Sequence, residues 1–415
     1  MEVKPGYRQT VIGVLPEQWE IKPLGELAAI KDGTHQTPRY VASGIPFYSV
    51  EHVTSGNFTD TKFITPQEHR FLSRSSKIER GDILMTRIGS IGDCKLIDWE
   101  VDASYYVSLA LLKVRAGISA AYIAQYSKSA AFQREIELHS LQSAIPKKIN
   151  LGPISDVKVA LPSLEEQHAI AKALGDIDEL LAGLGRLIAK KRDLKQAAMQ
   201  QLLTGQTRLP GFQGEWELRL LGDLGATYGG LSGKSKADFG SGNAKYVTFM
   251  NVMMNTVIDD STFEAVRVST TENQNRVESG DLLFNGSSET PEEVALCSLV
   301  ARDVPNLYLN SFCFGFRLRD DAQTSGLFLT YFIRSGEGRE IMKSLAQGST
   351  RYNLSKKALL AAEVRLPAVA EQTAIASVLS DMDAELTGFE ARRNKTLALK
   401  QGMLQELLTG RTRLV

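Results

Sequence analysis

Three short stretches of the chain combine hydrogen-bond donors and acceptors on glycine-containing backbone: KDGTHQTPRY at 31–40, LSGKSK at 231–236 and FNGSSET at 284–290. Side chains of these types suit both phosphate oxygens and base edges, since asparagine can read adenine with two hydrogen bonds and glutamate can accept from cytosine. Polar loops are also common as plain surface turns, and serine-rich loops often satisfy only their own backbone. The residue types alone therefore leave both interpretations open.

The candidate contacts in these stretches are Lys31, Thr34, His35, Gln36, Thr37, Arg39, Lys234, Ser235, Lys236, Asn285, Ser287, Ser288, Glu289 and Thr290. Weaker candidates, whose ordinary place is a solvated face, are Arg87, Lys147, Lys148, Arg351 and Tyr352.

Other kinds of chemistry fail on spacing. A Walker A loop needs a glycine five residues before Gly233, and that position is Tyr228. The chain has no Asn/Asp-Pro-Pro-aromatic motif of adenine methyltransferases, and its five histidines show no HxxH or HExxH pairing. We therefore predict no catalytic site, no metal site and no cofactor bound by this chain.

Composition restricts the class of protein. The 415 residues suffice for two to four domains, and 48 basic residues balance 48 acidic ones, so any affinity for DNA must come from a local patch. Three cysteines without CxxC spacing suit a reducing compartment, and no run of about 18 apolar residues or signal-like N-terminus occurs. We expect a cytoplasmic protein that does not cross a membrane.

A duplication organises the chain. LLTGQTRL at 202–209 returns as LLTGRTRL at 407–414, and the offset of 205 residues holds without a gap back to Leu161 and Leu366. About half of the positions in this segment are identical, which indicates a repeated unit.

Each copy has the pattern of one long helix. Apolar residues recur at alternating spacings of four and three, Ser163 and Glu166 form a capping-box pattern that Ala368 removes from the second copy, and Gly205 and Gly410 are natural stops. About 40 helical residues make a rod roughly 60 Å long. We predict that the two rods pack as an antiparallel coiled coil, although Lys191 and Arg393 interrupt the far half of each, which is then free to face a partner. The predicted seam is Ile170, Leu174, Ile177, Leu181, Leu184, Ile188, Ile375, Leu379, Met382, Leu386 and Phe389.

The segments outside the rods also echo one another. WEIKPLGEL at 19–27 is similar to WELRLLGDL at 216–224, and IERGDILMTRIGS at 78–90 is similar to VESGDLLFNGSS at 277–288. Runs such as GDILMT, SLALLKV, KYVTFMNV and FCFGFRL indicate strands, and helices are expected near 119–139 and 326–346. The predicted fold is α+β with internal pseudo-two-fold symmetry. The predicted domains are globular domains at 1–158 and 213–362, a central helical region at 159–212 and a distal one at 363–415.

The whole chain resembles the specificity subunits of type I restriction-modification systems. The resemblance is carried by GTHQTPRY, GIPFYSVEHV, GDILMTRIGSIG and LPSLEEQ in the first half, and by GKSKADFGSGNAKYVTFMNV, GDLLFNGSSETPEEV, YLNSF, GSTRYNLS and LLTGRTRL in the second. It implies two target-recognition domains that alternate with two conserved helical regions.

What the resemblance further implies is a non-catalytic subunit that reads double-stranded DNA for an assembly. Each domain would read one half of an asymmetric bipartite site, and the helices would set the spacer and dock two modification subunits, to which two restriction subunits are added. S-adenosylmethionine, ATP and Mg would belong to those partners. The resemblance also favours DNA contact by the polar loops.

Another class of interpretation treats the rods as a scaffold and the globular domains as binders of protein or sugar. The salt dependence of binding distinguishes this interpretation from DNA binding. Affinity for DNA falls steeply with ionic strength, because the protein neutralises phosphates. An enzyme that works alone would need a catalytic constellation, which the sequence lacks.

Overall fold

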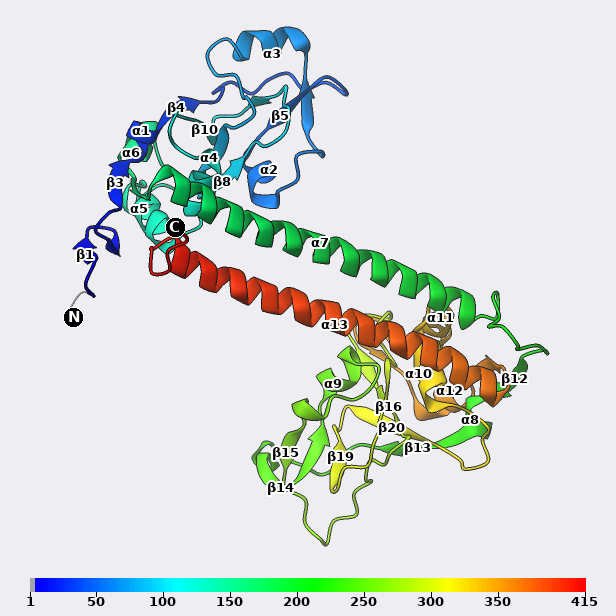
Figure 1. The fold of residues 1–415 in the computed structure, drawn as a ribbon. Coiled ribbons are helices and arrows are strands. Elements are labelled where there is room, and N and C mark those ends of the chain that lie inside the picture. Colours follow the sequence, from blue (N-terminus) through cyan, green and yellow to red (C-terminus); the bar gives the residue numbers. More distant parts are fainter. Residues whose placement is uncertain (1–3) are drawn as a thin grey trace. The chain divides into compact units, whose positions relative to one another are not determined.

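The computed structural model describes residues 4–415. The chain divides into two compact units: unit 1 is Met1–Gly185 with Ala391–Val415, and unit 2 is Arg186–Glu390. Each unit therefore combines one globular α+β domain with part of each long helix (Figure 1). This division differs from the four consecutive domains predicted from the sequence, because segments far apart in the chain share one core.

The two predicted rods are present as continuous helices, α7 (Leu164–Leu202) and α13 (Val369–Leu407), of 39 residues each. Both stop where the sequence predicts, because Gly205 and Gly410 adopt left-handed φ values of 72° and 67°. The pairing of acidic and basic residues within each unit, described below, shows that the helices run antiparallel there.

The apolar seam is buried along most of its length. Ile170 and Leu174 belong to the core of unit 1, and Ile375 and Leu379 belong to the core of unit 2. Leu184, Ile188 and Leu386 are also buried, whereas Ile177, Leu181, Met382 and Phe389 are half-buried.

The far parts of the helices return to the core. Met199 and Leu202 of α7, with Leu203 just after it, enter the core of unit 2, and Leu407 of α13, with Leu408 just after it, enters the core of unit 1. The ends of the far halves are therefore buried in the domain cores rather than free, whereas Leu194 and Leu399, nearer the middle of each far half, are exposed.

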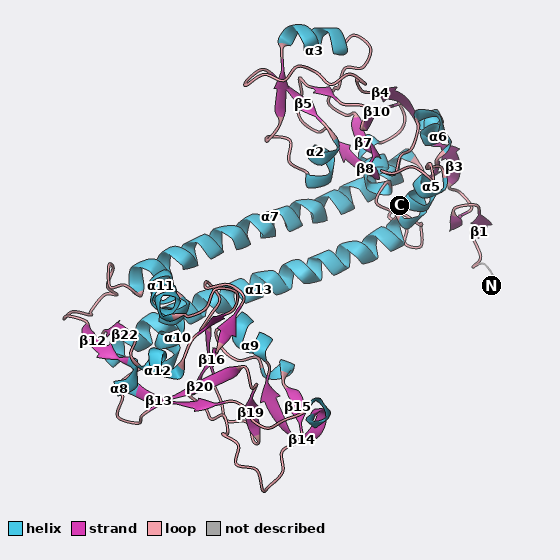
Figure 2. Ribbon diagram, turned by 180° about the vertical axis from the view of Figure 1, so that it is seen from behind, coloured by secondary structure: helices cyan, strands magenta, loops and turns pink. Residues whose placement is uncertain are grey.

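The two globular domains share one sheet plan. A four-stranded antiparallel sheet has the order β4-β10-β7-β8 in unit 1 and β13-β20-β16-β18 in unit 2. A three-stranded sheet accompanies it, in which the central strand, β5 or β14, has one antiparallel and one parallel neighbour. A strand just before each long helix, β11 or β22, pairs with an early strand of the same domain, β3 or β12. Figure 2 shows the pair of β12 and β22.

The elements of the first domain are β1 (Tyr7–Thr10), β2 (Gly13–Pro16), β3 (Glu20–Pro23), α1 (Leu24–Leu27), β4 (Ala28–Asp32), β5 (Ile45–Tyr48), α2 (Val50–Ser55), β6 (Lys62–Ile64), α3 (Pro66–Leu72), β7 (Ile83–Ile88), β8 (Ser90–Leu96), β9 (Ser104–Tyr105), β10 (Leu109–Val114), α4 (Ala120–Tyr126), α5 (Ala130–Leu138), α6 (Leu151–Asp156) and β11 (Lys158–Leu161).

The elements of the second domain are β12 (Glu217–Leu220), α8 (Leu221–Leu224), β13 (Gly225–Gly229), the 3-10 turn η1 (Lys236–Asp238), β14 (Phe239–Val247), α9 (Phe249–Met254), the 3-10 turn η2 (Asp260–Thr262), β15 (Glu264–Val266), β16 (Leu282–Asn285), β17 (Ser287–Ser288), β18 (Cys297–Leu299), β19 (Leu307–Leu309), β20 (Cys313–Leu318), α10 (Gly326–Arg334), α11 (Gly336–Leu345), β21 (Tyr352–Asn353), α12 (Lys356–Leu360) and β22 (Glu363–Leu366).

Two local predictions need correction. The run KYVTFMNV is not one strand, because β14 ends at Val247 and the Thr248 hydroxyl caps α9 by accepting from the Asn251 N–H at 3.2 Å. The helical stretches near 119–139 and 326–346 each break in two, where Ser129 and Ser335 cap a second helix.

The repeated Gly-Asp of the two echoing motifs is structural. The Asp82 carboxylate accepts from the Glu79 N–H and from Lys113, both at 2.8 Å. In the second domain Asp281 accepts from the Glu278 N–H and from Arg317, also at 2.8 Å. Each aspartate closes the turn before a central strand and neutralises a cation on the neighbouring strand, which explains why both domains carry it.

Candidate nucleic-acid interface

The first polar loop leaves β4 and is anchored at one point. The Thr34 N–H donates to the Tyr105 carbonyl at 3.2 Å, and the Thr34 carbonyl accepts from the Val107 N–H at 2.9 Å. His35 lies 2.8 Å from Asp32 with its side chain 70% exposed. Lys31, Gln36, Thr37 and Arg39 are exposed. The loop thus presents several donors on a fixed base.

Arg87 does not belong to this exposed set. It is 3% exposed, its Nε donates to the Val107 carbonyl at 3.0 Å, and its guanidinium lies 3.7 Å from Asp32. Its β-strand position places it inside the domain, where it supports the base of the 31–40 loop. The prediction that Arg87 is a solvated residue is wrong.

Lys147 and Lys148 lie on a loop beside the β7–β8 turn. The Lys147 carbonyl accepts from the Gly89 N–H at 2.8 Å, and Lys148 is half-buried. The Lys147 side chain is 58% exposed and lies 2.7 Å from Glu137, so its charge has an exposed partner. An exposed pair of this kind exchanges partners at little cost.

In the second polar stretch, residues that are neighbours in sequence differ in exposure. The Lys234 side chain is only 6% exposed, pairs with Glu272 at 2.5 Å and donates to the Arg267 carbonyl at 2.7 Å. Lys234 therefore holds the loop together, contrary to its predicted place on the surface. Ser235 and Lys236 are exposed, although the Ser235 hydroxyl donates to Asp238 at 2.8 Å.

In the third stretch the buried residues also serve the fold. Asn285 is 0% exposed and donates to the Ser287 and Glu293 carbonyls, while its Oδ1 has no hydrogen-bond partner among residues 4–415. Ser287 and Ser288 are each 7% exposed. These three candidate DNA contacts are therefore buried, and the alternative that the loop satisfies its own backbone describes them.

The same region nevertheless brings distant candidates together. Strand β17 pairs with β21, so Ser288 lies opposite Tyr352, and the Arg351 Nε donates to the Ser287 hydroxyl at 3.3 Å. Arg351, Glu289 and Thr290 are exposed around this strand pair. Phe312, which no sequence pattern singled out, is 61% exposed, and its ring lies 5.8 Å from the Arg351 guanidinium.

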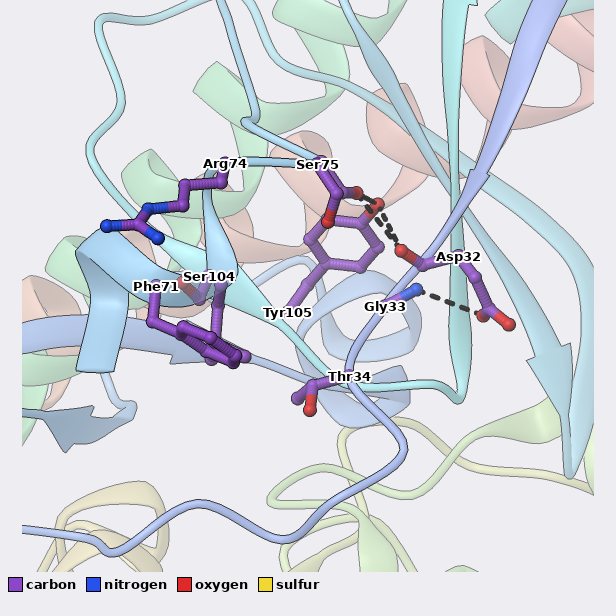
Figure 3. A pocket seen from close by; sticks show the side chains of 10 residues that line it. Asp32, Gly33, Thr34, Phe71, Arg74, Ser75, Ser104 and Tyr105 are labelled. Atoms are coloured by element: carbon purple, nitrogen blue, oxygen red, sulfur yellow. Dashed lines mark hydrogen bonds between the residues drawn. The ribbon is translucent and has the colours of Figure 1, made fainter.

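A cavity of about 320 Å³ adjoins the first polar loop and was also missed. Figure 3 shows Phe71 and Arg74 on one side of it and Asp32 on the other, with the Tyr105 ring between them. The Tyr105 hydroxyl donates to the Asp32 carbonyl at 3.0 Å, and burial raises the pKa of this phenol well above its usual range. Only the run HRFLSRSS marks this wall in the sequence, as an aromatic and a basic residue three apart.

The repeated tails carry a second kind of site, which we call the helix locks: Glu166 with Arg413 in unit 1, and Glu371 with Arg208 in unit 2. Glu166 is 0% exposed and accepts from Arg413 at 2.8 Å, and Glu371 is 1% exposed and accepts from Arg208 at 2.5 Å. Each lock joins the start of one long helix to the tail after the other. Bidentate guanidinium–carboxylate pairs of this kind hold the two side chains in a defined relative orientation.

Glu166 therefore has a different role from the one its capping-box pattern predicts. The Ser163 hydroxyl does accept from the Glu166 N–H at 3.2 Å, but the Glu166 carboxylate turns to Arg413 and to the Trp19 ring N–H, 3.1 Å away. The cap is thus one-sided. The glutamate secures the helix start against the globular domain and the C-terminal tail.

The glutamine after each lock residue ties a domain helix to a long helix. Gln167 accepts from the Ser119 N–H at 3.0 Å and donates to the Pro162 carbonyl at 2.9 Å. Gln372 repeats this with Ser325 at 2.9 Å and Pro367 at 2.8 Å. The Pro-x-x-x-Glu-Gln pattern is thus a joint between domain and rod.

A further ion pair in each unit fixes the antiparallel register. Asp178 of α7 lies 2.5 Å from Lys400 of α13, and Asp383 of α13 pairs with Lys195 of α7. These positions are equivalent under the repeat. Burial opposes ionisation of Asp178, but hydrogen bonds from Gln125, Lys400 and Lys128 outweigh it and hold the pKa of this carboxyl at about 2.

Asp178→Asn is expected to lower the free energy of unfolding of unit 1 by about 2 kcal/mol at pH 7, because a depressed pKa is worth about 1.4 kcal/mol per unit. The contribution is present above the ordinary pKa of 3.8 and is lost as pH falls towards 2, so the difference from wild type should shrink over that range. Urea denaturation at several pH values measures it. Asp176→Asn, whose side chain is 62% exposed, is the matched control. Equal effects of the two variants at pH 7 would contradict the assignment.

Residues 4–415 contain no helix long and apolar enough to cross a membrane. Within the same range no group of three or more His, Cys, Asp or Glu is placed to hold a metal ion.

Comparison with known proteins agrees with this geometry. A family model described as type I restriction modification DNA specificity domain matches twice, at residues 16–190 and 213–399. The type I restriction enzyme EcoKI specificity subunit of Escherichia coli K12 is 22% identical over 95% of this chain and 89% of its own.

Two solved structures share the fold. The S subunit of a type I restriction-modification system from M. genitalium superposes with a TM-score of 0.61 at 15% identity, covering 98% of both chains. A chain from a structural study of complex assembly and conformational transition of the type I R-M system gives a TM-score of 0.55 at 16% identity, covering 95% of this chain and 99% of its own. With the two family matches covering most of its length, the chain belongs to the type I restriction-modification DNA specificity family, the non-catalytic DNA-recognition component of these systems.

Proposed function

We propose that each globular domain reads one half of an asymmetric bipartite site in double-stranded DNA, while α7 and α13 set the spacer between the halves. The observation that carries the proposal is one sheet plan presented twice with different exposed loops. The tip of 31–40 is rich in His, Gln, Thr and Arg, whereas the second domain offers Lys236, Glu289, Thr290 and Arg351. Two equal scaffolds with unequal donors and acceptors suit two different half-sites.

We further infer that the helices dock two modification subunits, through equivalent positions. Leu194 on α7 and Leu399 on α13 correspond under the repeat, and they are 47% and 57% exposed. A single exposed leucine is ordinary on a protein surface, so the support comes from its recurrence at the same position of both repeats, as expected if two like partners bind equivalently. Two restriction subunits would complete the assembly, with S-adenosylmethionine, ATP and Mg held by the partners and none by this chain. Such an assembly would act on DNA in the cytoplasm.

An exchange of domains tests the half-site assignment. Residues 213–362 are replaced by the equivalent domain of a relative, and the methylated sequences are mapped in cells that carry the whole system. One half of the recognised site should change, while the other half and the spacer stay. The four lock residues lie outside the exchanged segment, so the chain should still assemble. A change of both halves together would refute the assignment.

The competing scaffold function, with domains that bind protein or sugar, makes a different prediction. If the chain reads DNA, affinity for a duplex that carries its site should fall steeply between 50 and 200 mM salt, because each neutralised phosphate contributes about 0.9 to the slope. Binding without dependence on salt or sequence would favour the scaffold function.

A further inference from the structure

The cavity beside the first polar loop has the size and the lining of a ligand-binding site, which an exposed loop by itself does not form. Its volume of about 320 Å³ lies at the low end of the roughly 300–1,000 Å³ usual for ligand pockets, so it suits a single ring. Thr34, from the exposed loop, forms part of its lining. Anything that the 31–40 loop contacts therefore lies beside its mouth.

One wall of the cavity offers an aromatic face and a free cation. Phe71 is 67% exposed, which is unusual for so large an apolar side chain in a domain with its own core. Arg74 is exposed and makes no ion pair or side-chain hydrogen bond with any of residues 4–415. Figure 3 shows both side chains on the side of the cavity away from Asp32.

The opposite wall does not repel an anion strongly. The Asp32 carboxylate is already occupied, because it accepts from the Gly33 N–H at 3.0 Å and lies 2.8 Å from His35 and 3.7 Å from Arg87. Its backbone carbonyl accepts from Tyr105 and Ser76. The hydrogen-bonding groups of Asp32 therefore already have partners within the domain. The groups left for a ligand are the Phe71 ring and the Arg74 guanidinium on the other side.

The aromatic wall is held in place from below. Phe71 is on α3, and His69 of the same helix is 6% exposed. One ring nitrogen of His69 lies 2.9 Å from the Ser104 hydroxyl and the other lies 2.9 Å from Asp102. Ser104 is 4% exposed on β9, inside the domain, so this Ser–His–Asp chain fastens α3 to the sheet. The helix that carries Phe71, and that ends two residues before Arg74, is thereby fixed to the sheet.

We propose that this cavity takes one unstacked nucleotide of the bound DNA, with its base against Phe71 and its phosphate on Arg74. An aromatic face accepts any base, and an adjacent guanidinium suits the phosphate that follows it. The proposal rests on the proposed DNA-reading function and adds to it a contact outside the base stack.

The site is confined to the first domain. In the second, residues 267–281 connect β15 to β16 without a helix, so nothing corresponds to α3. The nucleotide captured here belongs to the half-site that the first domain reads, and the other half-site has no such contact.

The test uses the full chain assembled with its modification subunits and a duplex that carries its own site. Phe71→Ala should weaken binding about 5- to 150-fold, the range expected for loss of one base–aromatic stack. Phe71→Trp should restore it. Arg74→Ala should reduce the slope of log affinity against log salt by about 0.9, as for one lost phosphate contact. Val11→Ala, at a site 83% exposed, and Arg80→Ala, with a side chain 65% exposed, are the matched controls and should change neither quantity.

An abasic scan then locates the base. Removing the base that Phe71 holds should weaken wild-type binding but should not weaken Phe71→Ala further, since both changes delete one contact. That position should fall in the first domain's half-site. Thermal unfolding at the wild-type temperature shows that each variant is folded.

Wild-type affinity of folded Phe71→Ala, or penalties that add at every abasic position, would overturn the proposal. A wild-type assembly without preference for any duplex sequence would instead refute the proposed function itself. The two failures are therefore distinguishable.

Discussion

Arg413→Ala is expected to lower the free energy of unfolding of unit 1 by about 3 kcal/mol, because it leaves the buried Glu166 carboxylate without its cation. Glu166 is 0% exposed, and the remaining donor to its carboxylate would be the Trp19 ring N–H at 3.1 Å. Thermal and urea unfolding measure the loss. Arg208→Ala should destabilise unit 2 in the same direction, through Glu371.

Two comparisons separate the lock from general disturbance of the tail. Arg411→Ala removes a neighbouring arginine whose side chain is 66% exposed and lies 3.9 Å from Glu406, so its effect should be small. Glu166→Gln added to Arg413→Ala removes the unpaired charge and should recover part of the stability. If Arg413→Ala were no worse than Arg411→Ala, the lock would have no energetic role.

Lengthening both long helices together is expected to change the DNA spacer. Four residues inserted after Leu187 in α7 and four after Glu390 in α13 fall close to the border between the units on each helix. The pairs of Asp178 with Lys400 and of Lys195 with Asp383 then keep their register. Each helix grows by roughly 6 Å, comparable to nearly two base-pair steps of about 3.4 Å. The preferred spacer should become one or two base pairs longer, with both half-sites unchanged.

Mapping of methylated sites in cells reads out this change directly. An insertion in α7 alone is the informative control, because it displaces Lys195 from Asp383 and should reduce stability rather than give a longer spacer. The four extra residues turn the helix by about 40° beyond one full turn, which packing can absorb. Methylation at the original spacing by a stable, doubly extended assembly would show that the helices do not set the spacer.

The long helices were predictable almost to the residue, and the reason is physical. An apolar seam at helical spacing and a left-handed stop at Gly205 and at Gly410 are local properties, so they need no knowledge of distant partners. The domain strands GDILMT and FCFGFRL were found for the same reason.

What the sequence did not reveal depends on distant pairing. Glu166 and Arg413 are separated by 247 positions, and the local capping-box pattern offered a sufficient but incomplete role for the glutamate. A signal was present, since a glutamate and an arginine recur at the same offset in both copies. The noncontiguous composition of unit 1 follows from such contacts and has no local mark.

The candidate DNA contacts show the limit of residue types. Arg87, Lys234 and Asn285 have suitable chemistry, but each is turned inward by hydrogen bonds to its own domain. Polarity does not report exposure when a loop folds back on its own backbone. Phe71 and Phe312 show the converse. Large apolar side chains are expected in the core, so the sequence did not mark these two as exposed, yet both lie on the surface.

Each helix lock combines a glutamate from one repeat with an arginine from the other, and this exchange suggests how the chain evolved. One repeat supplies a glutamate at its helix start and an arginine in its tail, and in the present chain each lock takes its two halves from different repeats. Two separate copies of a single-repeat polypeptide would form both locks as a symmetric homodimer. Gene duplication and fusion of such an ancestor requires no new contact, and it frees the two globular domains to diverge from a palindromic target to an asymmetric one.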